Sequence, residues 1–172
     1  PYLSVNVSPV QLREETFVRE LRALLADTGL PPRRLQLELT EGTVMEEPER
    51  AARVLGELSE MGVRIALDDF GTGHSSLAYL RTFPIDCIKI DRAFVLDLGA
   101  DGREAAIVPA IVAIARSLGA GVVAEGVESG TQRQALVSMG CREMQGYLFS
   151  RPLPAEECGA RFLGAAAPAA AG

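Results

Sequence analysis

Short apolar runs rich in β-branched residues alternate with longer amphipathic segments along nearly the whole chain. The runs predict strands at 3–7, 35–39, 63–67, 87–90, 121–124 and, more weakly, near 143–144. The amphipathic segments predict helices at 14–28, 48–61, about 76–82, 103–118, 131–139 and 155–163. A repeated strand–helix order with short connections requires parallel strands joined by helical crossovers. The fold class is therefore α/β, either a TIM-like (β/α) barrel or a doubly wound open sheet.

The overall charge and the absence of certain motifs exclude several classes of protein. The net charge is −6, which argues against duplex nucleic acid as a partner. A phosphate ligand remains compatible with this charge, because bound metal cations reverse the local sign. No glycine-rich dinucleotide-binding motif follows the first predicted strand, and no apolar run is long enough to cross a membrane.

The three cysteines, Cys87, Cys141 and Cys158, show no paired spacing. A disulfide framework or a zinc site is therefore not expected, and a reducing, cytoplasmic location is predicted for this part of the protein. A membrane anchor elsewhere in the full-length protein is compatible with that prediction.

Polar side chains collect at the carboxyl ends of the predicted strands. Within each strand, apolar residues alternate with small or charged ones, so the two kinds face opposite sides of the sheet. The polar residues nearest the strand ends are Asn6, Glu38, Asp68, Lys89 and Glu125. Barrels and open α/β sheets both bind ligands at this end, so these five side chains are expected to converge.

A cluster of this composition predicts a metal site. Crowded carboxylates resist ionisation unless cations compensate them, and Lys89, the only lysine in the chain, supplies a single positive charge. The candidate ligands are all oxygen donors, which favours Mg²⁺ or Mn²⁺ over Zn²⁺. Asp68 and Asp69 are adjacent and can both reach metal if the chain turns there, as Gly71 and Gly73 would permit.

Six short segments, taken in order, resemble the EAL family of cyclic di-GMP phosphodiesterases. They are Val-Asn-Val-Ser at 5–8, Glu-Leu-Thr-Glu at 38–41, Asp-Asp-Phe-Gly-Thr-Gly at 68–73, Lys-Ile-Asp at 89–91, Ala-Glu-Gly-Val-Glu at 124–128 and Gln-Gly-Tyr at 145–147. The resemblance implies a TIM-like barrel with two metal ions. It also implies hydrolysis of one phosphodiester bond of cyclic di-GMP to give linear pGpG.

The resemblance assigns the metal ligands residue by residue. Asn6, Glu38 and Asp68 correspond to ligands of one ion. Asp68 and Asp69 correspond to ligands of the second ion, with Glu125 beside it as a ligand or a base. A structural interpretation stays open for each: a helix cap for the two aspartates, and an ion pair for Glu38 or Glu125.

Further roles also follow only from the resemblance. Lys89 corresponds to the residue that holds the attacking water. Glu41 and Glu128 correspond to supports for the loop that begins at Asp68, although either could instead be a helix-terminal charge. Asp91 and Gln145 are assigned to contacts near the substrate or the metal-bound water.

The Glu-Ala-Leu signature that names the family is absent from the chain. We expect an EAL domain at 1–164 that lacks its N-terminal strands, a disordered Ala/Pro tail at 165–172, and no activity from this fragment alone. The full protein is expected to carry sensory or GGDEF domains, and a homodimer is one option for its assembly. The alternatives are a non-catalytic cyclic di-GMP-binding domain of the same fold and a magnesium-dependent barrel enzyme with enolate chemistry.

Overall fold

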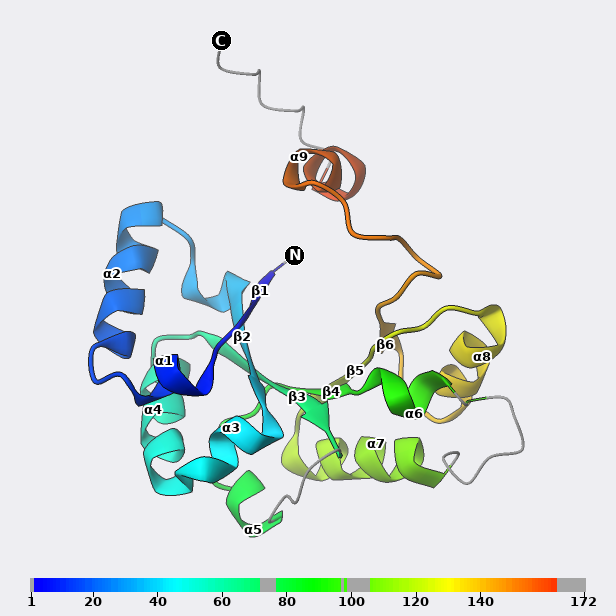
Figure 1. The fold of residues 1–172 in the computed structure, drawn as a ribbon, viewed down its shortest axis with the longest axis horizontal. Coiled ribbons are helices and arrows are strands. Elements are labelled where there is room, and N and C mark those ends of the chain that lie inside the picture. Colours follow the sequence, from blue (N-terminus) through cyan, green and yellow to red (C-terminus); the bar gives the residue numbers. More distant parts are fainter. Residues whose placement is uncertain (1, 72–76, 97, 99–105, 164–172) are drawn as a thin grey trace.

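In the computed structural model the chain forms one curved sheet of parallel strands (Figure 1). The structure describes residues 2–71, 77–96, 98 and 106–163. The strands in these residues are β1 (Leu3–Asn6), β2 (Leu35–Thr40), β3 (Arg64–Phe70), β4 (Cys87–Ile90), β5 (Gly121–Ala124) and β6 (Glu143–Met144). Each strand pairs with the next along the chain, in the order β1-β2-β3-β4-β5-β6. The predicted α/β class is confirmed, and the sheet has the form of a half-barrel.

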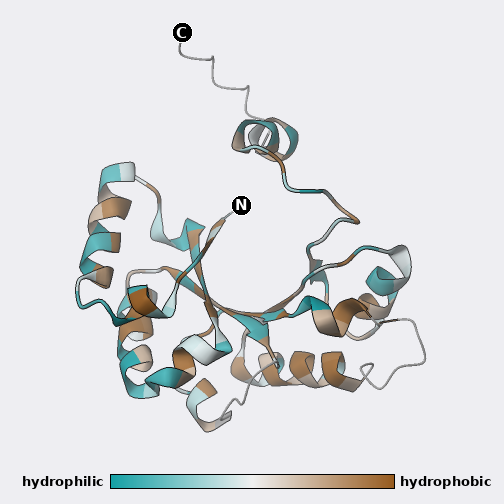
Figure 2. Ribbon diagram, in the orientation of Figure 1, coloured by the Kyte–Doolittle hydropathy of each residue, from teal (hydrophilic) through white to brown (hydrophobic). Residues whose placement is uncertain are grey.

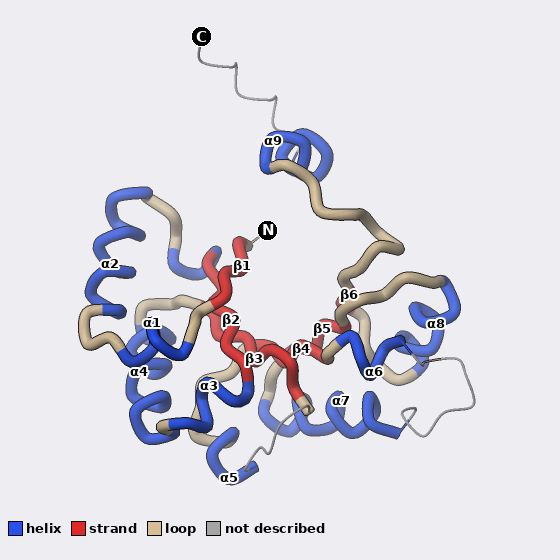
Figure 3. Tube along the Cα trace, in the orientation of Figure 1, coloured by secondary structure: helices blue, strands red, loops and turns tan. Residues whose placement is uncertain are grey.

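Helices cover the convex side of the sheet, and its concave side stays open (Figures 1 and 3). They are α1 (Pro9–Arg13), α2 (Phe17–Thr28), α3 (Glu41–Glu46), α4 (Pro48–Glu60), α5 (Leu77–Leu80), α6 (Arg92–Leu96), α7 (Ile107–Leu118), α8 (Gly130–Ser138) and α9 (Ala155–Cys158), with a 3-10 turn η1 (Pro32–Arg34) and a π-helical turn η3 (Gly159–Leu163). Helix α9 stands apart from the others, beyond β6.

The main core lies between the sheet and these helices. The convex face of the strands contributes buried side chains, among them Leu37, Leu39, Ile65 and Ile88. In Figure 2, helices α2 and α4 carry both brown and teal, whereas α7 is brown along most of its length. On the concave face, Ala66, Cys87 and Val123 form a small separate apolar cluster, and the polar side chains of Gln36 and Lys89 are buried as well. The alternation read from the sequence therefore matches the two faces of the sheet.

Several predicted boundaries were wrong, and local capping explains why. The helix expected at 14–28 begins only at Phe17, since the chain is extended at Glu14. A separate short helix before it, α1, was not predicted; Ser8 and Gln11 form the capping box that starts it. Thr40 accepts a hydrogen bond from the backbone of Thr43, and so starts the short α3, which was not predicted. Helix α6 was also missed. The predicted starts of two helices, at 76 and 103, and the predicted tail at 165–172 lie outside the described residues.

Strand β3 runs through the Asp68-Asp69 pair, although the sequence placed its end before them. The register against β4 shifts between Leu67 and Phe70, and Asp69 has a φ of 52°, in the left-handed region. This bulge breaks the regular alternation of the strand, so the two adjacent carboxylates need not face opposite sides of the sheet. The sequence suggested a turn permitted by the glycines; in the structure the strand instead continues to Phe70 and the irregularity lies at Asp69. Gly71 does follow with a φ of 94°, while Gly73 lies outside the described residues.

Strand β1 is an edge of the sheet, and its outer face is apolar and exposed. Leu3 and Val5 are 56% and 41% exposed. They line a groove of about 570 Å³ together with residues of α2 and β2, among them Leu24 and Leu37. None of the described helices has the length and apolar character needed to span a bilayer.

Candidate functional site

Lys89 lies at the point where three strands bring their carboxylates together. Its Nζ is 2.5 Å from Glu38 Oε2, 3.1 Å from Asp68 Oδ1 and 2.6 Å from Glu125 Oε1. The lysine side chain is 6% exposed, so all of these ion pairs are largely removed from water. Four of the five residues expected to converge are therefore in direct contact, at the carboxyl ends of β2, β3, β4 and β5.

Burial and the shared ion pairs act in opposite directions on these groups. Burial alone would lower the pKa of Lys89, but its hydrogen bonds to Glu125, Glu38 and Asp68 outweigh that effect and raise the pKa. Burial also raises the pKa of Glu125, and the contact with Lys89 offsets this only in part. Lys89 is therefore firmly protonated, and one ammonium group serves three carboxylates.

The second aspartate of the pair faces a different neighbour. Burial raises the pKa of Asp69, and the nearby carboxylates of Asp68 and Asp91 raise it further. Asp91 also accepts a hydrogen bond of 2.8 Å from the backbone N–H of Ala93, at the start of α6. Asp91 is thus held by the backbone and placed beside Asp69, close to the cluster around Lys89.

Glu38 is held through both of its carboxylate oxygens. Lys89 donates to Oε2, and the hydroxyl of Ser4 donates to Oε1. Ser4 Oγ in turn accepts a hydrogen bond of 3.1 Å from Gln36 Nε2. Gln36 is 2% exposed, and its Oε1 has no hydrogen-bond partner among the described residues.

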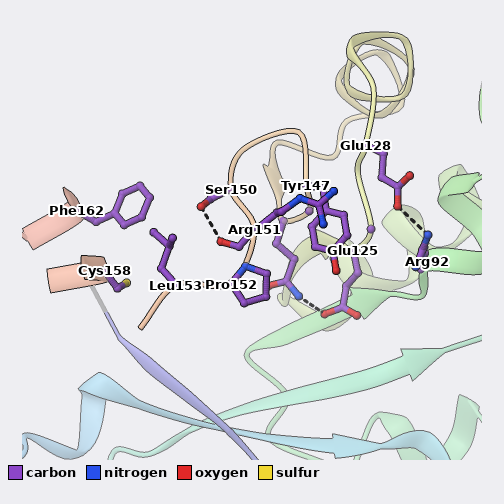
Figure 4. Close-up of a pocket in the computed structure, with 13 residues that line it drawn as sticks. Arg92, Glu125, Glu128, Tyr147, Ser150, Arg151, Pro152, Leu153, Cys158 and Phe162 are labelled. Atoms are coloured by element: carbon purple, nitrogen blue, oxygen red, sulfur yellow. Dashed lines mark hydrogen bonds and ion pairs between the residues drawn. The ribbon is translucent and has the colours of Figure 1, made fainter. Parts of the chain in front are cut away.

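A cavity of about 480 Å³ opens beside the cluster (Figure 4). Gln145 Nε2 donates to Glu125 Oε1 at 2.6 Å, so the glutamate on this wall is fixed by both Gln145 and Lys89. Phe162 and Cys158, from the C-terminal helical segment, line the opposite side (Figure 4).

The two glutamates expected to support the loop that begins at Asp68 make different contacts. Glu41 is buried, and its Oε2 accepts a hydrogen bond of 3.1 Å from the backbone N–H of Gly71. Glu128 forms an ion pair of 2.7 Å with Arg92, at the start of α6 (Figure 4). Glu41 therefore contacts the segment that follows β3, whereas Glu128 joins the β5–α8 connection to α6.

The donor set suits a hard divalent cation. Three carboxylates converge on one ammonium nitrogen, so negative charge is in excess, and every carboxylate atom is an oxygen donor. Asn6 lies beside Glu38 in the register of β1 and β2 and adds an amide oxygen at the same strand ends. Within the described part of the chain, no three His, Cys, Asp or Glu side chains already surround a common cation position.

Sequence reasoning missed three residues that contact the site. Ser4 and Gln36 carry no charge and precede the motif residues by two positions, so only strand alternation could have placed them on the same face. Arg92 was missed because arginine is common in this chain and its partner was assigned elsewhere. The sequence signal for Arg92 was the glycine at 126. In the structure an added Cβ there would lie 2.3 Å from Arg92 Cγ, so a larger residue would collide with the arginine.

A half-barrel of parallel strands with an acidic site at their carboxyl ends defines an α/β protein of the (β/α)-barrel class. Comparison with known families makes the assignment narrower: the EAL domain model matches residues 1–152. The chain therefore belongs to the EAL domain family.

Individual relatives agree with this assignment. The chain is 45% identical over 155 residues to the bifunctional diguanylate cyclase/cyclic di-GMP phosphodiesterase MucR of Pseudomonas aeruginosa, covering 90% of this chain and 23% of MucR. The structure of the MucR phosphodiesterase in complex with c-di-GMP has a TM-score of 0.87, with 91% of this chain and 63% of that chain covered. The EAL domain of Mycobacterium smegmatis DcpA is 39% identical, with a TM-score of 0.90, and 97% and 75% covered.

A third relative bears on the metal. BlrP1 of Klebsiella pneumoniae, in a manganese/cy-diGMP complex, is 38% identical with a TM-score of 0.80, covering 88% of this chain and 39% of that one. The chain spans about a fifth of the length of curated relatives such as MucR, so what those whole proteins do is not carried over directly.

Proposed function

We propose that the protein containing this chain hydrolyses a phosphodiester bond of cyclic di-GMP with the help of two divalent metal ions, Mg²⁺ or Mn²⁺. One observation carries the proposal: Glu38, Asp68 and Glu125 converge from three strands on Lys89. Two relatives support it: the structures of MucR and BlrP1 were solved with this nucleotide, and that of BlrP1 also with manganese.

The proposed ligands are Asn6, Glu38, Asp68, Asp69 and Glu125. Bound there, divalent ions would stabilise charge on the phosphodiester and lower the pKa of a coordinated water. The bulge at Asp69 supports a shared site, because it breaks the alternation that would place two adjacent aspartates on opposite faces of the sheet.

Lys89 is proposed to hold the attacking water. Its ammonium group has three donors, and in the structure all of them are engaged by carboxylates. When cations neutralise those carboxylates, the same group can donate to a water between them. Gln145 keeps Glu125 in place, and Glu41 holds the backbone at Gly71 beside the aspartate pair.

The test uses the full-length protein. Incubation with cyclic di-GMP and Mg²⁺ or Mn²⁺ should yield linear pGpG, and removal of metal with EDTA should stop the reaction. Binding of the nucleotide without hydrolysis, at saturating metal, would instead identify a receptor domain of the same fold. Neither binding nor hydrolysis would refute both assignments.

A further inference from the structure

A chain of hydrogen bonds leads from a buried amide to the candidate metal ligand Glu38. Gln36 Nε2 donates to Ser4 Oγ at 3.1 Å, and the Ser4 hydroxyl donates to Glu38 Oε1. Ser4 and Gln36 are paired in the register of β1 and β2, and Glu38 is two residues further along the same strand. The three side chains therefore share the concave face of the sheet.

The direction of these bonds is fixed by chemistry. An ionised carboxylate only accepts hydrogen bonds, so the single Ser4 proton must point to Glu38. The lone pairs of Ser4 Oγ then accept from Gln36. If the Gln36 amide were turned around, its oxygen would face Ser4 Oγ with no proton between them. The observed orientation is thus the one that lets Gln36 direct the Ser4 hydroxyl.

We propose that Ser4 and Gln36 are positioning residues for Glu38, which hold its Oε1 side so that the carboxylate faces the cation site. The inference rests on the proposed function, because it takes Glu38 to be a metal ligand. Hydrogen bonds from such outer partners fix the orientation of a ligand, and their loss typically weakens metal binding about 10–100-fold. Lys89 contacts only Oε2, so Ser4 holds the opposite oxygen.

Direct measurement of Mn²⁺ binding to the full-length protein tests the role of Ser4. Electron paramagnetic resonance of free Mn²⁺, without nucleotide, should show at least a tenfold higher Kd for Ser4→Ala. Ser4→Thr keeps the hydroxyl and should bind like the wild type. Ser117→Ala is the matched control, because Ser117 Oγ donates only to its own helix at Ile114 O. Equal Mn²⁺ affinity of Ser4→Ala and wild type would overturn the proposal.

A double-mutant cycle tests the role of Gln36. Gln36→Leu should weaken Mn²⁺ binding less than Ser4→Ala, because the amide acts only through the hydroxyl. The double variant should then bind Mn²⁺ within about twofold of Ser4→Ala alone, since coupled residues are not additive. If the losses of Mn²⁺ affinity in the two single variants add up in the double variant, Gln36 does not act through Ser4. Melting temperatures establish that each variant is folded, and Ser4→Val, which differs from Ser4→Thr by the loss of the hydroxyl, replaces Ser4→Ala if the latter is not.

Hydrolysis assays separate this inference from the proposed function. In Ser4→Ala, the Mn²⁺ concentration for half-maximal rate should rise while kcat at saturating Mn²⁺ largely recovers. A lower kcat with unchanged Mn²⁺ dependence would contradict a positioning role. A wild-type protein that never forms pGpG would refute the proposed function, yet the Mn²⁺ affinities would still decide whether Ser4 positions a ligand.

Discussion

At the scale of single residues, Lys89 makes the most demanding set of contacts. One nitrogen reaches three carboxylates at 2.5–3.1 Å from a buried position. A guanidinium is planar and larger, so Lys89→Arg cannot place one donor atom at that point. We expect kcat of the full-length protein to fall more than tenfold, a loss of at least about 1.4 kcal/mol. The exposed Arg133→Lys is the matched control, and retention of more than a tenth of kcat would return Lys89 to a structural role.

Asp68 contributes charge to the same cluster. Asp68→Asn should abolish hydrolysis, because an amide cannot replace a carboxylate shared between two cations. The melting temperature should stay the same or rise, since one of several crowded negative charges is removed. Parallel assays of pGpG formation and thermal unfolding check both parts. Near-normal turnover with saturating Mn²⁺ would refute the assignment of Asp68.

The cysteines are expected to differ sharply in reactivity. Burial raises the pKa of both Cys87 and Cys141 to about 11, whereas Cys158 is exposed. At pH 8 only about one in a thousand of the buried thiols is ionised. Iodoacetamide should therefore modify Cys158 first in the native protein, as read by peptide mass spectrometry, and all three in denaturant. Comparable native alkylation of Cys87 and Cys158 would contradict the burial.

Because the pKa values of both buried thiols are raised in the folded state, the stability that these thiols contribute is complete below about pH 8.5 and is lost as pH rises toward 11.

At the scale of elements, sequence reasoning worked where a residue pattern decides the structure. The strands at 87–90 and 121–124 were predicted to the residue, because each is a short run that contains two β-branched residues and follows a predicted helix or loop. The bulge at Asp69 was not foreseen, since a left-handed aspartate inside a strand depends on the partners around it rather than on local preference. The same applies to Ser4 and Gln36, whose roles exist only after two strands pair.

The connection after β6 depends on a glycine. Gly146 has a φ of 153°, and an added Cβ would lie 2.3 Å from the backbone N and O of Val127. Gly146→Ala should therefore destabilise the domain by about 1–3 kcal/mol, because backbone atoms cannot move aside as a side chain can. Gly56→Ala is the matched control: nothing lies within 4 Å, and alanine in a helix should add up to about 1 kcal/mol. Thermal unfolding of both variants measures the difference, and equal effects would refute the clash.

At the scale of the whole molecule, the open sheet has an unprotected edge. The outer face of β1 presents Leu3 and Val5 beside a groove of about 570 Å³. Residues 1–172 expressed alone should therefore self-associate through this edge. Val5→Lys should reduce the mass measured by light scattering, whereas Val137→Lys, at a helix position that is 50% exposed against 41% for Val5, should not. A monomeric wild-type fragment, or an equal effect of both lysines, would contradict this interface.

The sheet order, in which every strand lies next to its neighbour in sequence, also bears on synthesis by the ribosome. As the chain emerges, each new strand finds its partner already present, one helical connection earlier along the polypeptide. Every pairing step therefore closes a loop of similar and moderate size, so no step carries an unusually large entropic cost. This topology favours assembly in the order of synthesis, from β1 to β6. Limited proteolysis of stalled nascent chains of increasing length would show whether resistance to protease grows one strand at a time.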